Sequence, residues 1–359
     1  MLAVVAAALL AGSIAPASAI DFAKQQALAE KGVRYLESAV PGSGDTNVAR
    51  EMLVARAIFK HRIDDRHPKV AAAVALARQV MADPVHENHK IDELGLSLTL
   101  LAELTPPQPA VRGNEHQRLC KQIYDRIIAR QSPDGSWRND SGRGDILLTR
   151  SALLAIWWYQ GDEAADDSPA ERACNWLLLT QSPAGAWANH SKDPGTDVRV
   201  PPEQTRLAPF VAGVSGLYIA ADLLHFEQER TFSSPFQSIE PRKPTTTVID
   251  PARLWHALDL ADRYWAANAH ADAGKLQLDY LHSLERYYAF RDHVRGHSVP
   301  RGGPRWYNDG VELLARTQAP DGHWASQANS FGPATDTALA ILFLYHVRRD
   351  ACFGESCRP

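Results

Sequence analysis

A seven-residue phrase, Gln-x-Pro-x-Gly-x-Trp, occurs three times in this chain, at residues 131–137, 181–187 and 318–324. Each copy follows an apolar helical stretch. Proline ends a helix, because it lacks the backbone N–H and restricts the residue before it. Glycine then permits the turn, and tryptophan buries a large ring that carries one hydrogen-bond donor. The phrases therefore predict three corners between helices in a repeat protein. Their shared residues are Gln131, Gly135, Trp137, Gln181, Gly185, Trp187, Gln318, Gly322 and Trp324.

Reading outward from these corners, we divide the chain into about six helical hairpins. The paired segments lie near 22–39 and 46–62, 68–82 and 90–104, 115–131 and 145–160, 169–181 and 207–226, 251–268 and 276–293, and 304–318 and 335–349. The second member of a hairpin is apolar on nearly every side, which predicts burial, whereas the first carries a charged face. The pattern predicts an all-α fold, namely an α/α toroid that forms an (α/α)6 barrel. An open solenoid is the alternative.

The ends of the chain indicate export. Residues 1–19 are apolar and end in Ala-Ser-Ala, a small-x-small cleavage pattern, although no basic residue precedes Lys24. We predict a signal peptide over 1–19, with a short anchor as the alternative, a toroid over 20–350 and a tail over 351–359. The product would be periplasmic or extracellular. No later stretch is apolar and long enough to span a bilayer, and a net charge of -4 gives no reason to expect nucleic acid as a partner.

Cysteine and histidine give weaker signals. Cys352 and Cys357 could close a small disulfide in the tail, whereas Cys120 and Cys174 are either paired or buried as apolar thiols. His86 and His89 are three residues apart, a spacing that could place both imidazoles on one metal ion if they lay on a helix. They follow a Pro that marks a loop, however. We therefore predict no metal and no cofactor. Irregular segments interrupt the hairpins near 189–206 and 227–250.

The phrase at a helix end resembles the turn motif of the prenyltransferase and squalene-cyclase repeat superfamily. The C-terminal run 276–344, which contains Trp306-Tyr307 and Asp336-Thr337-Ala338, resembles secreted bacterial proteins with such repeats. The resemblance covers about residues 110–349. It implies a helical toroid, and it is much less specific for activity.

The reactive groups of characterised members do not match this chain. Squalene–hopene cyclases protonate an alkene with an Asp in a D-x-D-D-T-A run, and here the proton-donor position holds Thr335. Asp336 matches the last Asp of that run, and we predict that it is the N-cap of the final helix. The Zn²⁺ ligands of prenyltransferases and the Gly-Cys-Gly-Glu-Gln thioester motif are also missing from the sequence.

Several polar residues of the second helices could still carry chemistry. The candidate catalytic acids are Asp336, Asp279 and Glu285, and the candidate cavity residues are Asp145, Arg150, Trp157 and Arg286. Structural roles compete with each of these functions. Glu285 and Arg286 could be a buried pair, and Asp145 could be an N-cap.

The sequence leaves three functional hypotheses. The first is a mostly non-catalytic toroid that binds an apolar small molecule or a protein partner. The alternative is a terpenoid-cyclase-like enzyme with a non-standard acid, such as Asp279 or Asp336. The second alternative is a carbohydrate-active (α/α)6 enzyme, in which Asp145, Asp279 and Asp336 would converge as paired carboxylates.

Overall fold

The structure, a computed structural model, describes residues 22–39, 47–82, 90–105, 115–160, 166–191, 207–227, 243–268, 277–297, 304–327 and 331–345. Several predicted features lie outside these residues: the signal peptide that we predict, the tail with Cys352 and Cys357, the pair His86 and His89, and most of both irregular segments. Export and the terminal disulfide therefore stay predictions.

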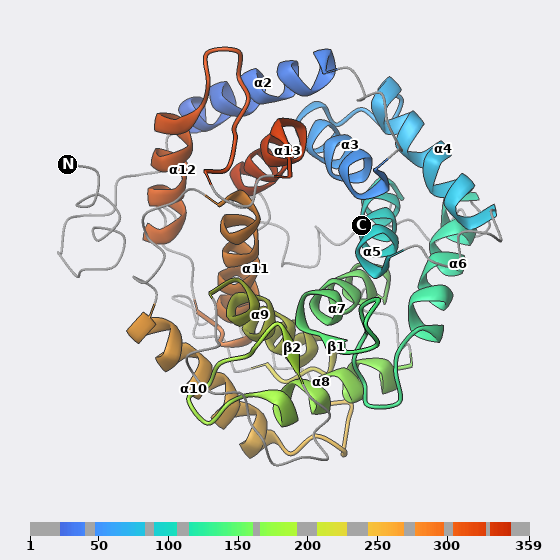
Figure 1. Cartoon of the computed structure of the whole chain (residues 1–359), viewed down its shortest axis with the longest axis vertical. Coiled ribbons are helices and arrows are strands. Elements are labelled where there is room, and N and C mark those ends of the chain that lie inside the picture. The colour runs from blue at the N-terminus through green and yellow to red at the C-terminus, as the bar shows by residue number, and fades with distance from the viewer. Residues whose placement is uncertain are drawn as a thin grey trace, which may run out of the picture. The chain divides into compact units, whose positions relative to one another are not determined.

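Twelve helices and one two-stranded ribbon make up the described part of the chain (Figure 1). The first helices of the hairpins are α2 (Phe22–Ser38), α4 (Pro68–Ala82), α6 (Glu115–Ala129), α8 (Ser168–Thr180), α10 (Pro251–Asn268) and α12 (Arg305–Thr317). The second helices are α3 (Val48–Arg62), α5 (Ile91–Leu104), α7 (Ile146–Gln160), α9 (Leu207–Leu223), α11 (Leu278–Val294) and α13 (Pro333–Leu344). Strand β1 (Gly144–Asp145) pairs antiparallel with β2 (His190–Ser191). The predicted six hairpins are confirmed.

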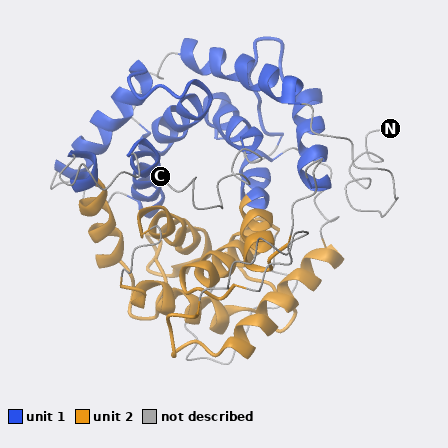
Figure 2. Cartoon of the chain, turned by 180° about the vertical axis from the view of Figure 1, so that it is seen from behind, with its two compact units in different colours: residues 1–119, 272–285, 299–359 blue, residues 120–271, 286–298 orange. Residues whose placement is uncertain are grey.

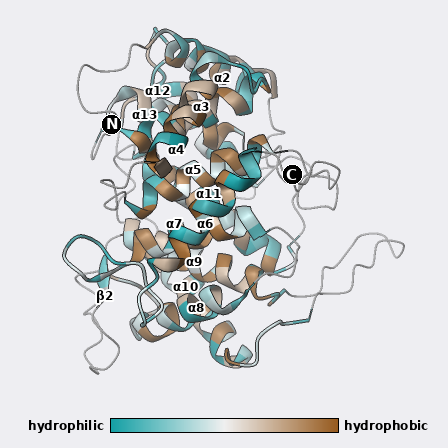
Figure 3. Cartoon of the chain, turned by 90° about the vertical axis from the view of Figure 1, so that its right-hand side faces the viewer, coloured by the Kyte–Doolittle hydropathy of each residue, from teal (hydrophilic) through white to brown (hydrophobic). Residues whose placement is uncertain are grey.

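Burial separates the two kinds of helix as the sequence predicted. Every residue of α9 except Ala208 is buried, and α13 is buried from Thr335 to Leu344. By contrast, α12 buries only Tyr307, Gly310, Val311 and Leu314. Figure 3 shows hydrophobic and hydrophilic residues together on α4, a first helix with one buried and one exposed face. Burial of the second helices therefore supplies most of the hydrophobic core.

The helices form two compact units (Figure 2). Unit 1 contains residues 1–119, 272–285 and 299–359, and unit 2 contains residues 120–271 and 286–298. Within unit 1, α13 packs against α2 and α3, and α12 packs against α2. The first and last hairpins are thus neighbours, which a closed ring requires and an open solenoid does not provide. Within unit 2, α9 packs against both α7 and α8.

The three corners share one set of contacts. The indole N–H of Trp137, Trp187 and Trp324 donates to a carbonyl in the last turn of the preceding helix, at 2.8, 2.9 and 2.9 Å. All three indoles are almost fully buried. The indole thus satisfies a carbonyl that would otherwise have no partner at the end of the helix.

The glutamine amide of each corner instead joins two first helices. It donates to the glycine carbonyl of its own phrase and to a carbonyl of another first helix. Gln131 reaches Pro169 of α8 at 2.8 Å, Gln181 reaches Ala257 of α10 at 2.9 Å, and Gln318 reaches Leu28 of α2 at 3.0 Å. The corners therefore connect α6 to α8, α8 to α10, and α12 to α2.

Only glycine fits at the tip of each corner. Gly135, Gly185 and Gly322 have φ near +95°, a conformation that side chains rarely adopt. A Cβ atom there would lie 2.1, 2.4 and 2.4 Å from the carbonyl oxygens of Arg172, Leu260 and Lys31 respectively. The same glycines thus permit both the turn and the close approach of the next first helix.

Two sequence questions are answered within the described residues. Cys120 and Cys174 are buried and are not paired in a disulfide, so the apolar-thiol interpretation holds, and burial raises the pKa of Cys174 to about 12. Among the described helices, none combines the length and the hydropathy needed to cross a membrane.

Candidate functional site

Four second helices carry an aspartate at or within their first turn: Asp92 of α5, Asp145 at α7, Asp279 of α11 and Asp336 of α13. The N-terminal end of a helix favours negative charge, because its backbone N–H groups have no partner within the helix. We call these four residues the first-turn acids. The sequence analysis selected three of them and missed Asp92. Asp92 stands at the start of a second helix, as the other three residues do, and this shared position is a sequence signal that could have identified it.

Asp336 is fully buried and holds the start of α13 against a neighbouring loop. Its Oδ2 accepts a hydrogen bond from the backbone N–H of Ser326 at 2.7 Å. The N-cap of α13 is Gly332, and the helix begins with Pro333. The prediction that Asp336 is itself the N-cap is therefore wrong, since the helix starts almost one turn earlier than the sequence suggested. Proline is well tolerated at that first helical position.

Asp279 lies at the same end of unit 1 as Asp336. The hydroxyl of Ser326 accepts from the backbone N–H of Leu278 at 3.1 Å, while its own backbone N–H donates to Asp336. Ser326 thus joins the first turns of α11 and α13. Asp279, next to Leu278, is only half-buried and keeps access to solvent.

Asp145 of unit 2 acts as an N-cap, as one interpretation of the sequence held. Its Oδ1 accepts from the backbone N–H groups of Leu147 and Leu148 at 2.9 and 3.1 Å. Its Oδ2 lies 3.4 Å from Nδ1 of His190, which is more exposed than Asp145 and also lies 3.2 Å from Nδ2 of Asn139. The carboxylate is therefore committed to holding helix α7 and the β-ribbon together.

Asp92, in the first turn of α5, is a carboxyl group with a raised pKa. Burial is the main cause that raises the pKa of Asp92, and the neighbouring charge of Glu93 adds to the effect. A carboxyl group with a raised pKa holds its proton nearer to neutral pH. This property is what a general acid needs.

The remaining predicted residues lie further along their helices. Glu285 and Arg286 are about 1% and 3% exposed within α11, which leaves little surface for a ligand. Arg150 of α7 lies beside Gly216 of α9, where an added Cβ would be 3.6 Å from its side chain. Trp157 is half-buried and donates its indole N–H to Asp222.

A second polar cluster lies in unit 2 and was not predicted. It consists of Asp222 of α9, Glu227 just beyond α9, and His293 of α11, whose donor atoms all lie within 4.8 Å of one another. His293 Nε2 is 3.0 Å from Asp222 Oδ1 and 3.8 Å from Glu227 Oε1. These residues come from distant parts of the chain with no motif spacing, so the sequence alone gave no signal.

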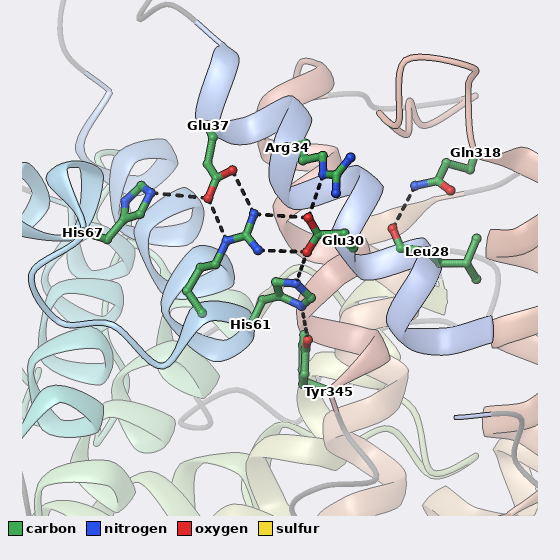
Figure 4. Close-up of polar contacts among 9 residues, drawn as sticks. Leu28, Glu30, Arg34, Glu37, His61, His67, Gln318 and Tyr345 are labelled. Atoms are coloured by element: carbon green, nitrogen blue, oxygen red, sulfur yellow. Dashed lines mark hydrogen bonds and ion pairs between the residues drawn. The ribbon is translucent and has the colours of Figure 1, made fainter. Parts of the chain in front are cut away.

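A charged network in unit 1 joins α2, α3 and α13 (Figure 4). Glu30 accepts from His61 at 2.6 Å and from Arg62 at 2.8 Å, and Arg62 also donates to Glu37 at 2.8 Å. His61 makes a further hydrogen bond with Tyr345. Hydrogen bonds, first from His61 and then from two arginines, lower the pKa of Glu30 to about 2. This network, which we call the clasp, has a structural role. Its ion pairs hold α2 against α3, and the bond between His61 and Tyr345 joins this first hairpin to the last one.

Comparison with known proteins supports the fold. No protein family profile matches the sequence, and no curated protein matches it. Among solved structures, the chain is similar to an inactive variant of an alpha-1,6-mannanase, GH76A of Salegentibacter sp. HEL1_6, in complex with alpha-1,6-mannotriose. The TM-score is 0.57 at 8% identity, and the match covers 90% of this chain and 98% of that one. The neighbour is an (α/α)6 toroid, so the predicted fold class is confirmed.

Proposed function

We propose that this protein is a carbohydrate-active α/α toroid that binds an oligosaccharide and hydrolyses a glycosidic bond. The observation that carries the proposal is the fold similarity, over nearly the whole of both chains, to a mannanase that holds a mannotriose. This comparison favours the carbohydrate alternative over the apolar-ligand hypothesis that ranked first from the sequence. A relationship to squalene cyclases stays a hypothesis, supported by the corner phrases.

The first-turn acids are our candidates for the carboxyl groups that glycoside hydrolysis requires. Most glycosidases use two carboxyl groups, one protonated to assist the leaving group and one ionised to activate water or attack the sugar. We assign the proton-donor role to Asp92, because burial raises its pKa. We assign the ionised role to Asp279, which is half-buried and on the same end of its helix. Asp145 and Asp336 then position helices by binding backbone N–H groups.

The proposal is tested by incubating the purified protein with a panel of glycans that includes alpha-1,6-linked mannan, and measuring released reducing ends. We expect Asp92→Asn and Asp279→Asn to lower the rate by about 100-fold or more, because each removes an acid or base. The matched control is Asp125→Asn, an exposed carboxylate of α6 paired with Lys121, which should leave the rate unchanged. Circular dichroism establishes that each variant folds.

A wild-type protein that neither hydrolyses nor binds any glycan of the panel in calorimetry would overturn the proposed function. Hydrolysis that survives both substitutions would instead overturn the assignment of Asp92 and Asp279 as the catalytic carboxyl groups.

A further inference from the structure

We propose that Asp222, Glu227 and His293 form a binding site for a divalent transition-metal ion, with Zn²⁺ as the expected occupant. The proposal is independent of the glycan site, because it depends on a different set of residues, all within unit 2.

The geometry of the three donor atoms fits one ion. Metal–ligand distances of about 2.1 Å place neighbouring ligand atoms about 3.0–3.4 Å apart in octahedral or tetrahedral geometry. The imidazole Nε2 of His293 lies 3.0 Å from Asp222 Oδ1 and 3.8 Å from Glu227 Oε1. Small rotations of the Glu227 side chain, which is 13% exposed, are enough to bring all three atoms to one ion.

The supporting contacts resemble those around established metal ligands. Asp222 binds through one oxygen, while its other oxygen accepts the indole N–H of Trp157. Such outer hydrogen bonds fix the orientation of a ligating carboxylate. Trp157 is itself held edge-on against Phe290 of α11, at 5.0 Å between ring centroids. The ligand set is thus supported from both α7 and α11.

The backbone after α9 returns Glu227 toward the other two ligands. Helix α9 ends in an αL cap at His225, where φ is 59°, and the backbone N–H of Phe226 donates to the carbonyl of Ala221 at 2.8 Å. This position usually holds glycine, because a side chain is strained there. Strain of this kind persists where the surrounding structure determines it, often at ligand sites.

Charge favours a cation at this place. The side chains of Asp222 and His293 are 2% and 5% exposed, so this carboxylate and this imidazole lie in a poorly solvated environment. A divalent ion neutralises both carboxylates and accepts the neutral imidazole as a ligand. Imidazole nitrogen together with carboxylate oxygen favours a first-row transition metal over Ca²⁺, which prefers oxygen ligands alone.

The test is calorimetric titration of untagged, chelator-treated protein with Zn²⁺, together with visible absorption after addition of Co²⁺. We expect one tight site in the wild-type protein, and a Co²⁺ band that moves when the site changes. His293→Gln should lower the affinity by about 10-fold or more. The matched control is His61→Gln. His61 also contacts a carboxylate, that of Glu30, but it belongs to the clasp of unit 1. We expect this variant to bind Zn²⁺ as the wild-type protein does.

Failure of the wild type to bind Zn²⁺ stoichiometrically would overturn the proposal, and so would equal losses in His293→Gln and His61→Gln. In that case, an imidazolium shared between two carboxylates explains the cluster without a metal. Should His293→Gln fail to fold, Glu227→Gln decides the matter, because Glu227 lies outside α9 and its substitution preserves the helices. We expect Glu227→Gln also to weaken Zn²⁺ binding by about 10-fold.

Discussion

The corner at 318–324 in unit 1 and the corner at 131–137 in unit 2 use the same contacts for different purposes. Gln131 reaches a carbonyl 38 positions away, in the next first helix along the chain. Gln318 reaches one 290 positions away, in the first helix of all. In a chain whose middle is unfolded, the longer separation costs about 2 kcal/mol more in loop closure. We therefore expect the corner at 318–324 to form late in folding.

The contacts around the corner at 318–324 offset this cost. Lys24 of α2 pairs with Glu312 of α12 at 2.6 Å, and the hydroxyl of Tyr307 donates to the carbonyl of Leu344 at 2.8 Å. The clasp adds one further hydrogen bond between the first and last hairpins, that of His61 with Tyr345. The comparison teaches that one local phrase serves both to pack neighbouring hairpins together and to join the first and last hairpins of the chain.

The largest effect is expected from a methyl group at a corner tip. Gly322→Ala should destabilise the protein by at least about 2 kcal/mol, because the residue has φ of +96° and the new Cβ would meet the carbonyl of Lys31. The measurement is chemical denaturation. Gly142→Ala is the matched control. Gly142 also has a positive φ, at +72°, but a Cβ added there would meet nothing within 4 Å. This substitution should therefore lower the free energy of unfolding by only about 1 kcal/mol. Equal losses would show that backbone strain, not the close approach of α2, limits the corner.

A smaller effect is expected from the clasp, and it depends on pH. The pKa of Glu30 is lowered to about 2 and the pKa of Glu37 is also lowered, chiefly by the hydrogen bond from Arg62. A carboxylate with a lowered pKa stabilises the fold above its unfolded pKa of about 4.5, and this stabilisation is lost as the pH falls toward 2.

Arg62→Met should therefore lower the stability by about 1 kcal/mol at pH 7, because these ion pairs are partly exposed. The difference from wild type should shrink as the pH falls from about 4.5 toward 2, because the carboxylates of the unfolded chain take up protons before those of the folded protein do. Thermal denaturation across this pH range gives the readout, and Arg34→Met, in which a 73% exposed arginine is removed, should have little effect. A constant difference at every pH would indicate that Arg62 acts through packing alone.

The sequence predicted the corners well, because their chemistry is local. Proline, glycine and tryptophan within seven residues determine a turn, its φ and an indole contact with the preceding helix. The tertiary partners of the corners could not be predicted, because no residue near Gln318 in the sequence indicates that its amide binds the carbonyl of Leu28. For the same reason Asp145 could be interpreted as a cap, while the cluster of Asp222, Glu227 and His293 was missed, since only tertiary packing brings these residues together.

The prediction for Asp336 failed for a different reason. The preference of Asp for N-cap positions placed the helix start at the aspartate, whereas Pro333 starts the helix and Gly332 caps it. Asp336 then binds Ser326 across a loop whose path no local pattern determines. Helix ends depend on a few weak contacts, so they are less predictable than the helices themselves.

The most direct test of whether the corner at 318–324 joins the first and last hairpins is to compare amide hydrogen exchange in two variants, Gly322→Ala and Gly135→Ala. Our account predicts that Gly322→Ala increases exchange in α2, α3, α12 and α13 together, and that Gly135→Ala increases it in α6 and α8 while leaving those four helices protected. Increased exchange confined to residues 318–324 in the first variant, with α2 still fully protected, would contradict the account.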